Sequence, residues 1–173
     1  MVGPVVVGHM DSARTVQICR TAQPEDPRAT VSVEMITANI TEESTAVVEI
    51  GVTWEGDASV LLFGNTVPIE LPHRCSWPET GLVLLPSPNG YERRADEPEC
   101  WKPNLPADDD FGHPLGLMRK EVETGDILSC RAEIWGDHWA ENCLEPGEYW
   151  FEETLSIENE GYAGWGFALR IES

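Results

Sequence analysis

The stretch "GWGFALRIE" (residues 164–172) alternates strictly between large apolar side chains and small or charged ones. Trp165, Phe167, Leu169 and Ile171 fall on one face of an extended chain. Successive side chains of a β-strand point to opposite faces of its sheet. The stretch therefore predicts a strand that is buried on one side only, as in an antiparallel sheet.

The same alternation occurs earlier in the chain. "TVSVEM" (30–35) places Val31, Val33 and Met35 on one face. After the polar turn "TEES", "AVVEIGVTW" (46–54) does the same with a larger apolar set: Ala46, Val48, Ile50, Val52 and Trp54. Strand, turn and strand in this order predict an antiparallel pair.

Further strand patterns recur up to the end of the chain, and none of the segments has a helical period. They are found at 59–64, 67–72, 81–86, 116–122, 126–135 and 144–158. We predict an all-β fold: an immunoglobulin-like antiparallel β-sandwich of seven to eight strands over residues 30–173. Residues 1–29 lack a clean period and are predicted to be a flexible N-terminal arm or linker, in which "GHM" (8–10) is typical of a cloning remnant. The proline-rich residues 72–114 are predicted to be a long loop insertion.

The charge of the chain is unusually negative. There are 31 acidic against 11 basic residues, a net charge of −20, and only Lys102 and Lys120 are lysines. Such a charge disfavours nucleic acid and anionic lipid as partners. Because the acids are spread along the whole chain, we expect adaptation to molar salt, which screens their repulsion.

The sequence also bears on location. No run approaches the ~18 apolar residues that a membrane span needs, and the N-terminus is a poor match to a signal peptide. Five cysteines and the sequon at Asn39 favour an extracellular or cell-surface protein. Reduced cysteines would instead place it in the cytoplasm.

The cysteines predict a covalent framework of two disulfides. Cys130, on a strand, is expected to form a disulfide with Cys143, which comes before the next strand. Closing a loop of this size stabilises the fold by about 3 kcal/mol in the chain-entropy model. Cys75 and Cys100 lie near the two ends of the insertion and are expected to tether it. Cys19 is left free.

Two segments resemble a known group of proteins. Residues 30–68, from "TVSVEM" to "LLFGNTVP", resemble the opening strands of small immunoglobulin-like domains of halophilic archaea. "LEPGEYWFEETLSI" (144–157) resembles their turn into the penultimate strand, a feature shared with intracellular proteinase-inhibitor-like sandwiches of bacilli. The resemblance covers residues 30–71 and 115–172; it implies the fold and no catalytic residue. Many such domains are exported lipoproteins, but "VQIC" (16–19) departs from a lipobox.

Several residues that could bind a metal or act in catalysis also have structural interpretations. Zinc could be bound by Cys130, Cys143, His73 and His138, but no CxxC pair occurs. Asp108, Asp109 and Asp110 are consecutive, unlike the alternating ligands of a calcium loop. Glu152 and Glu153, with Glu148 nearby, could suggest a glycosidase pair, but neighbouring strand residues face opposite sides. No metal, cofactor or catalytic residue is therefore predicted.

The seven tryptophans are the remaining feature of the sequence that bears on function. Trp54 and Trp165 fit the buried pattern. Four others lie at loops or strand ends and form a candidate binding surface: Trp77, Trp101, Trp135 and Trp139. Packing of Trp77 and Trp101 between insertion and sandwich is the structural alternative.

These features predict a non-enzymatic binding or structural module that contacts a protein, or a carbohydrate. Two alternatives remain. A proteinase inhibitor would present the strapped loop 75–100, and a metal-dependent enzyme would use His73, His138 and the cysteines.

Overall fold

The computed structural model describes residue 3 and residues 13–78, 81–112 and 116–173. These residues form two antiparallel sheets, and among them there is no α-helix, only the 3-10 turn η1 (Pro98–Cys100). Sheet A contains, in spatial order, β3 (Asn39–Ile40), β1 (Arg14–Ala22), β11 (Gly161–Glu172), β10 (Gly147–Ile157), β5 (Ser59–Phe63) and β8 (Met118–Val122). Sheet B contains β2 (Ala29–Thr37), β4 (Val47–Trp54), β9 (Ile127–Gly136), β7 (Leu82–Pro86) and β6 (His73–Arg74).

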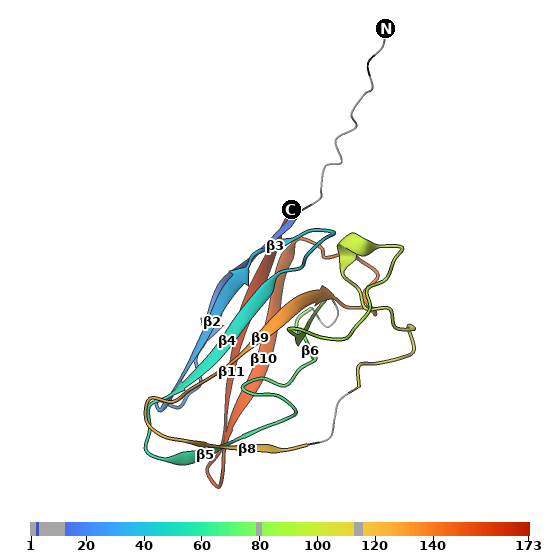
Figure 1. Cartoon of the computed structure of the whole chain (residues 1–173). Helices are drawn as coiled ribbons and strands as arrows, with labels where there is room; N and C mark the ends of the chain where they lie inside the picture. The colour runs from blue at the N-terminus through green and yellow to red at the C-terminus, as the bar shows by residue number, and fades with distance from the viewer. Residues whose placement is uncertain (1–2, 4–12, 79–80, 113–115) are drawn as a thin grey trace.

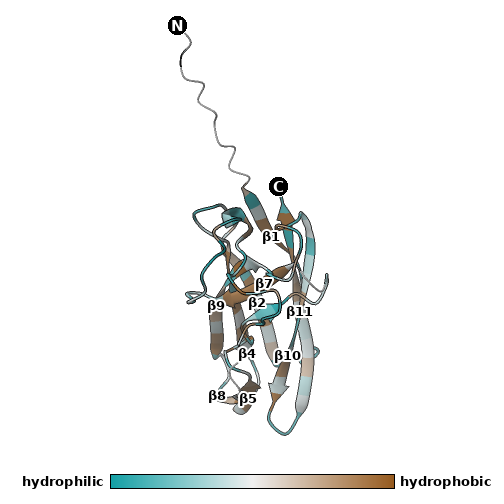
Figure 2. Cartoon of the chain, turned by 90° about the vertical axis from the view of Figure 1, so that its right-hand side faces the viewer, coloured by the Kyte–Doolittle hydropathy of each residue, from teal (hydrophilic) through white to brown (hydrophobic). Residues whose placement is uncertain are grey.

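The two sheets pack on each other in a sandwich-like arrangement (Figures 1 and 2). The alternating residues of β4 and β11 meet in one buried cluster, to which Ile50, Trp54, Phe167 and Leu169 belong. The inward faces predicted from alternation at 46–54 and 164–172 are therefore confirmed. Burial of these apolar side chains is the main favourable contribution to the fold.

Strand β1 corrects the predicted N-terminal arm. Arg14–Ala22 pairs with β11 along seven residue positions, from Thr15↔Glu172 to Ala22↔Gly166. Its apolar residues are few, and a β-bulge between Ile18 and Arg20 interrupts the alternation that would have revealed it. Residues 1–2 and 4–12 of the predicted arm lie outside the described residues.

The predicted insertion 72–114 is also corrected in part. β7 lies inside it, pairs with β9, and has four fully buried residues, so it belongs to sheet B. Irregular structure begins after Pro86 and covers the outer face of sheet B, where Val83, Leu85, Phe111 and Trp135 form a second small core. Figure 1 shows this segment in yellow-green beside the sheets. In the described residues, the six strands of sheet A and the five of sheet B exceed the seven to eight expected, in part because β1 and the two-residue strands β3 and β6 were not predicted.

The edge of sheet B at β2 is covered by a side chain. The carboxamide of Gln23 donates to the carbonyl of Val31 (2.8 Å) and accepts from its N–H (2.7 Å). It thus pairs with β2 as a neighbouring strand would. Such cover reduces the risk of edge-to-edge association.

The free edge of β10 is covered by the chain that leaves β6. Ser76 and Trp77 donate their backbone N–H groups to the carbonyl of Trp150, and Trp150 donates to Trp77 (2.8 Å). His73 belongs to sheet B, and its Nε2 lies 2.9 Å from the carbonyl oxygen of Glu152 in sheet A. This segment therefore joins the two sheets along one side.

Candidate functional site

The outer face of sheet A carries a row of side chains across four chain segments. Trp77 faces Trp150, Trp150 faces Ala168, and Arg20 faces Ala168 on the other side. Directly opposed residues of antiparallel strands share a face. Tyr149 and Phe151 on either side of Trp150 are buried, so the Trp150 row lies on the face turned away from the core.

Glycine gives this face its shape. A Cβ at Gly166 would lie 2.6 Å from Cζ2 of Trp150, so the indole covers this position on the sheet. A Cβ at Gly164 would meet nothing within 4 Å, so the sheet is bare there. The face therefore steps down from the Trp150 ring to an open floor.

The step forms a groove of about 400 Å³. Its lining consists of Trp150, Glu152, Glu153 and Thr154 on β10, Gly164 and Trp165 on β11, and Ala22 at the end of β1. A second hollow of about 580 Å³ adjoins it and shares Ala22 and Gly164. The two hollows meet at these residues and are together called the groove, and Tyr162, 77 % exposed, lies in its far part.

Polar groups at the groove are held in place by their neighbours. Nε1 of Trp150 donates to Oε1 of Glu152 (3.0 Å). The guanidinium of Arg20 lies over the Trp150 ring, 5.2 Å from its centroid, and also pairs with Glu148 (2.9 Å). A cation above an indole is attracted by the ring quadrupole. The Trp150 ring is therefore fixed between the glycine floor and an arginine.

Cys19 lies at the bulge on β1, beside this face. Its Sγ donates to the carbonyl of Ala168 (3.4 Å). Burial, followed by the nearby Glu148, raises the pKa of its thiol. Cys19 is free, as predicted.

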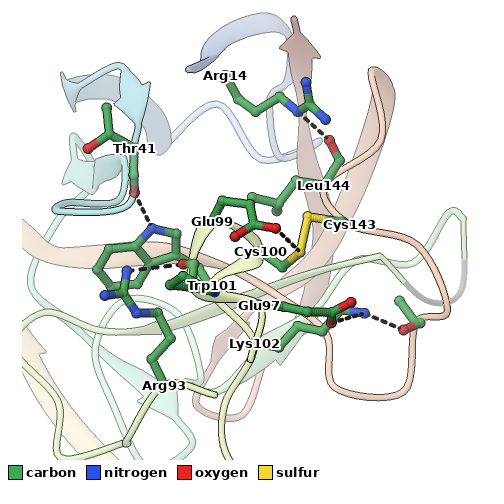
Figure 3. The surroundings of a disulfide bond; sticks show 12 residues. Arg14, Thr41, Arg93, Glu97, Glu99, Cys100, Trp101, Lys102, Cys143 and Leu144 are labelled. Atoms are coloured by element: carbon green, nitrogen blue, oxygen red, sulfur yellow. Dashed lines mark hydrogen bonds and ion pairs between the residues drawn. A yellow bond between two sulfur atoms is a disulfide. The ribbon is translucent and has the colours of Figure 1, made fainter. Parts of the chain in front are cut away.

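The predicted disulfide pairing is wrong in both bonds. Cys100 pairs with Cys143, and Cys75 and Cys130 are free thiols (Figure 3). Cys130 lies six residues before the end of β9, where the chain turns towards Cys143. At the usual rise per strand residue, this separates Cys130 from the turn by about 20 Å. A disulfide needs Cα atoms within about 7 Å, so strand β9 itself keeps Cys130 away.

The thiols left unpaired are buried to different degrees. Cys75 is buried and its Sγ donates to the carbonyl of Pro78 (2.9 Å). Burial raises the pKa of Cys75, and raises that of the half-buried Cys130 to about 11. Since a thiolate is the reactive form, these environments suppress reactivity.

The Cys100–Cys143 bond lies at a junction of several distant segments (Figure 3). Arg14 on β1 donates to the carbonyl of Leu144 (3.2 Å), and Nε1 of Trp101 donates to that of Thr41 (2.6 Å). The ammonium of Lys102, which is almost fully buried, donates to the carbonyl of Ala140 (2.7 Å). The disulfide thus tethers the irregular segment, but to the loop before β10 and not to Cys75.

The four predicted surface tryptophans do not form one surface. Trp135 is only 3 % exposed and packs edge-to-face on the half-buried Trp101 (5.3 Å), so these two belong to the core under the irregular segment. Trp139 is 39 % exposed and lies under the guanidinium of Arg74 (3.6 Å). Trp77, 71 % exposed, is the member that reaches the outer face of sheet A. The structural alternative, packing of Trp77 and Trp101 under the irregular segment, therefore holds for Trp101 and not for Trp77.

The predicted metal ligands are separated by other contacts. Nε2 of His138 donates to the carbonyl of Asp109 (2.7 Å), and its buried ring packs between Phe111 and Trp139. Because Cys143 is in the disulfide, the zinc set of Cys130, Cys143, His73 and His138 is not formed. In the described ranges, the metal-capable side chains that do cluster are Glu99, Cys100 and Cys143, of which the two cysteines are bonded to each other.

The acidic candidates have structural partners. Asp110 pairs with Arg74 (2.7 Å), which also binds the fully buried Asp137 (2.6 Å). Burial opposes the charged guanidinium, but these hydrogen bonds outweigh it and raise the pKa of Arg74. Asp108 is exposed, and the Asp109 carbonyl accepts from His138 and Trp139. This ion pair fixes the irregular segment to β6 and β9.

The glutamates of β10 are divided between the two faces. Glu148 and Glu152 lie with Trp150 on the outer face, whereas Glu153 lies 3.6 Å from Nδ1 of His73 and accepts from the backbone N–H of Glu70 (3.4 Å). The predicted opposition of Glu152 and Glu153 therefore agrees with their contacts.

The proteinase-inhibitor alternative rested on a disulfide that closes the loop 75–100. Loop 75–100 was expected to be strapped by a bond between its ends, and that bond is absent because Cys100 is paired with Cys143. Instead, the loop contains β7, which is buried in sheet B.

Comparison with known proteins adds no relative. No protein-family model, no curated protein and no solved structure matches the chain. Nowhere in the described ranges is there a helix of the length and apolarity that membrane crossing requires. The disulfide is compatible with an extracellular location.

Sequence reasoning missed the residues that shape the groove. Trp150 was not among the predicted surface tryptophans, and Gly164, Gly166 and Tyr162 were not connected with it. The alternation of "GYAGWGFALR" (161–170) holds the missed signal. It places Tyr162, Gly164, Gly166 and Ala168 on one strand face, which indicates a bare track beginning at an aromatic residue.

Proposed function

We propose that the protein is a non-enzymatic binding module of immunoglobulin-like topology, and that the outer face of sheet A recognises its ligand. The single observation that carries this is the groove beside Trp150, with the exposed Tyr162 in its lining and the exposed Trp77 paired with Trp150. Exposed aromatic side chains around a concave surface are typical of binding sites.

The strand order supports the immunoglobulin-like topology. In such domains strands A, B, E and D form one sheet and C, F and G the other. Here β2, β4, β9 and β7 follow one another in sheet B, and β5, β10 and β11 are neighbours in sheet A. In chain order these seven strands correspond to A, B, C, D, E, F and G.

A tyrosine contact supports the same assignment. Near the start of β10, the hydroxyl of Tyr149 donates to the carbonyl of Glu145 four residues upstream (2.6 Å). Immunoglobulin-like domains carry a comparable tyrosine at the start of strand F. Buried Phe151 stands two residues later, where antibody domains have a cysteine.

The groove offers shape more than reactive chemistry. Among the described residues its near part is lined by no histidine, cysteine or serine, and of its two glutamates Glu152 lies on the outer face whereas Glu153 contacts His73. This supports binding over catalysis as its role. A protein or a carbohydrate would be the partner.

We place the module outside the cell of a salt-adapted organism, as the resemblance to haloarchaeal domains implies. The disulfide and the net charge of −20 support this. Since salt screens carboxylate repulsion, the urea midpoint of unfolding should rise between about 0.1 M and 1 M KCl. An unchanged or lower midpoint would remove the salt-adapted assignment.

The binding role is tested on a panel of immobilised polysaccharides, peptides and lipid vesicles. The wild type is compared with Trp77→Ala and Tyr162→Ala, whose side chains are exposed and can be removed without loss of fold. The wild type should bind at least one ligand class. Each variant should bind that class with an affinity lower by about 10-fold or more, or roughly 1.4 kcal/mol.

The matched control is Trp139→Ala, an aromatic side chain outside the groove. It should bind as the wild type does. If no class is bound, or if all three variants bind alike, the outer face of sheet A is not the recognition surface.

A further inference from the structure

We propose that the groove on sheet A binds an uncharged polysaccharide strand that runs along β10 and β11 from Trp150 to Tyr162. This inference rests on the binding role proposed above and specifies its ligand class. It draws on the length of the groove, the chemistry of its lining and the balance of charge around it.

The groove is long and its floor is backbone. From Gly166 under the Trp150 ring to Tyr162 there are four strand residues, or about 13 Å at the usual rise. Between them Gly164 leaves the sheet bare. The two adjoining hollows of about 400 and 580 Å³ suit an extended ligand better than one compact molecule.

The lining combines aromatic rings with hydrogen-bonding groups. The C–H bonds of a sugar ring carry small positive charges and pack on the negative face of an aromatic ring. Tyr162 is exposed at one end of the groove, and at the Trp150 end the exposed Trp77 lies beside Trp150 on the neighbouring segment. Between them, Glu152 and Thr154 present oxygen atoms that can accept hydrogen bonds from sugar hydroxyls.

Half of the carboxylates in and beside the groove are paired with arginines. Glu148 pairs with both Arg20 (2.9 Å) and Arg170 (3.5 Å). Arg28 pairs with Asp26 (2.8 Å) and Glu160 (3.1 Å) in the far part of the groove. Three of the eleven basic residues of the chain therefore lie at this one face.

This balance separates an uncharged ligand from a charged one. A basic peptide would require free carboxylates, and three of the six in or beside the groove, namely Glu148, Asp26 and Glu160, already have an arginine partner. An anionic polymer would meet Glu152 and the overall charge of −20. The hydroxyl groups of a neutral glycan require neither free carboxylates nor an excess of positive charge, so a neutral glycan fits this surface best.

The test is titration of the intact protein with soluble neutral polymers, namely β-glucan, xylan and mannan. Alginate and heparin serve as anionic probes, a lysine-rich peptide as the basic probe and phosphatidylcholine vesicles as the lipid probe. At least one neutral polymer should bind, and its affinity should change less than about 3-fold between 0.1 M and 1 M salt. Charge-driven binding would fall steeply over that range.

Three variants locate the site. Gly164→Val fills the floor and should abolish neutral-polymer binding, by about 100-fold or more, or roughly 2.7 kcal/mol. Gly90→Val, in the irregular segment where a Cβ also meets nothing within 4 Å, should bind as the wild type does. Glu152→Gln keeps the hydrogen-bonding shape without the charge; it should weaken a glycan by less than about 10-fold but a basic peptide by more.

The outcomes separate this inference from the proposed function. Peptide or vesicle binding that Gly164→Val and Tyr162→Ala abolish, without binding of any neutral polymer, would overturn the glycan and leave the recognition face standing. Neutral-polymer binding that these variants do not affect would also overturn the inference. A wild type that binds none of the probes would overturn both.

Discussion

The indole of Trp150 occupies the space that a side chain at position 166 would need. A Cβ on Gly166 would lie 2.6 Å from Cζ2 of that ring and 2.6 Å from the backbone oxygen of Phe151. Trp150 and Gly166 lie on adjacent strands of sheet A. The glycine therefore decides where the aromatic wall of the groove lies.

Gly166→Ala is expected to destabilise the protein by about 1–3 kcal/mol, because the backbone oxygen cannot move as a flexible side chain can. Trp150 should also be displaced, which changes its fluorescence. The matched variant Gly164→Ala meets no atom within 4 Å and should stay within about 0.5 kcal/mol of the wild type. Urea unfolding of both variants measures the difference, and equal stabilities would contradict the contact.

The disulfide yields a second prediction. Cys100 and Cys143 close a loop with a sequence separation of 43, for which chain entropy gives about 4 kcal/mol. The double variant Cys100→Ser/Cys143→Ser should lose about this free energy of unfolding and become insensitive to reductant. Cys19→Ser, at a free and half-buried position, should remain reductant-sensitive. Peptide mapping that recovers Cys130–Cys143 or Cys75–Cys100 would overturn the pairing.

The ion pair between Arg74 and Asp137 yields a third. The Asp137 side chain is fully buried, so Arg74→Leu leaves an uncompensated charge and should cost about 3–5 kcal/mol. The double variant Arg74→Leu/Asp137→Leu should recover part of this loss, since no buried charge remains. Arg131→Leu breaks an exposed pair with Glu49 (3.0 Å) and should cost less than about 1 kcal/mol. A similar cost for both single variants would show that burial does not govern the pair.

Much of the fold could be predicted because alternation reports directly on burial. The inward faces of β4 and β11 follow from their sequences alone, as does the β7 segment "GLVLLP" (81–86). The pattern failed at β1, where the bulge between Ile18 and Arg20 shifts the register. A bulge moves later side chains to the other face, so a strict period of two no longer fits.

The site was harder to predict because it depends on pairing between distant strands. Whether two cysteines meet depends on where the strands carry them, and β9 carries Cys130 away from Cys143. In the same way, exposure of a tryptophan depends on what packs over it. Trp135 belongs to the small core under the irregular segment, and its strand pattern does not show which segment packs over it.

Stability at alkaline pH gives a final prediction. Burial raises the pKa of Tyr149 from 10.0 to about 12, and that of Cys130 from 9.0 to about 11. Burial raises the pKa of Cys75 as well. In the unfolded chain these groups lose their protons at their ordinary pKa, while the folded protein still holds them. Between the two values the folded state binds more protons, so stability falls as pH rises.

The stabilisation by these neutral groups is therefore fully present below about pH 9. It is lost as pH rises through about 11 for Cys130 and 12 for Tyr149. Urea unfolding at pH 8, 10 and 11.5 should show this decline. Tyr149→Phe should flatten the decline above about pH 10, whereas below that pH the loss of its bond to the Glu145 carbonyl should lower its stability by about 1 kcal/mol. Cys130→Ser should flatten the part that begins near pH 9, whereas Tyr162→Phe, at an exposed position, should keep the wild-type slope. If both buried-site variants also keep that slope, neither group is protected from deprotonation by the fold.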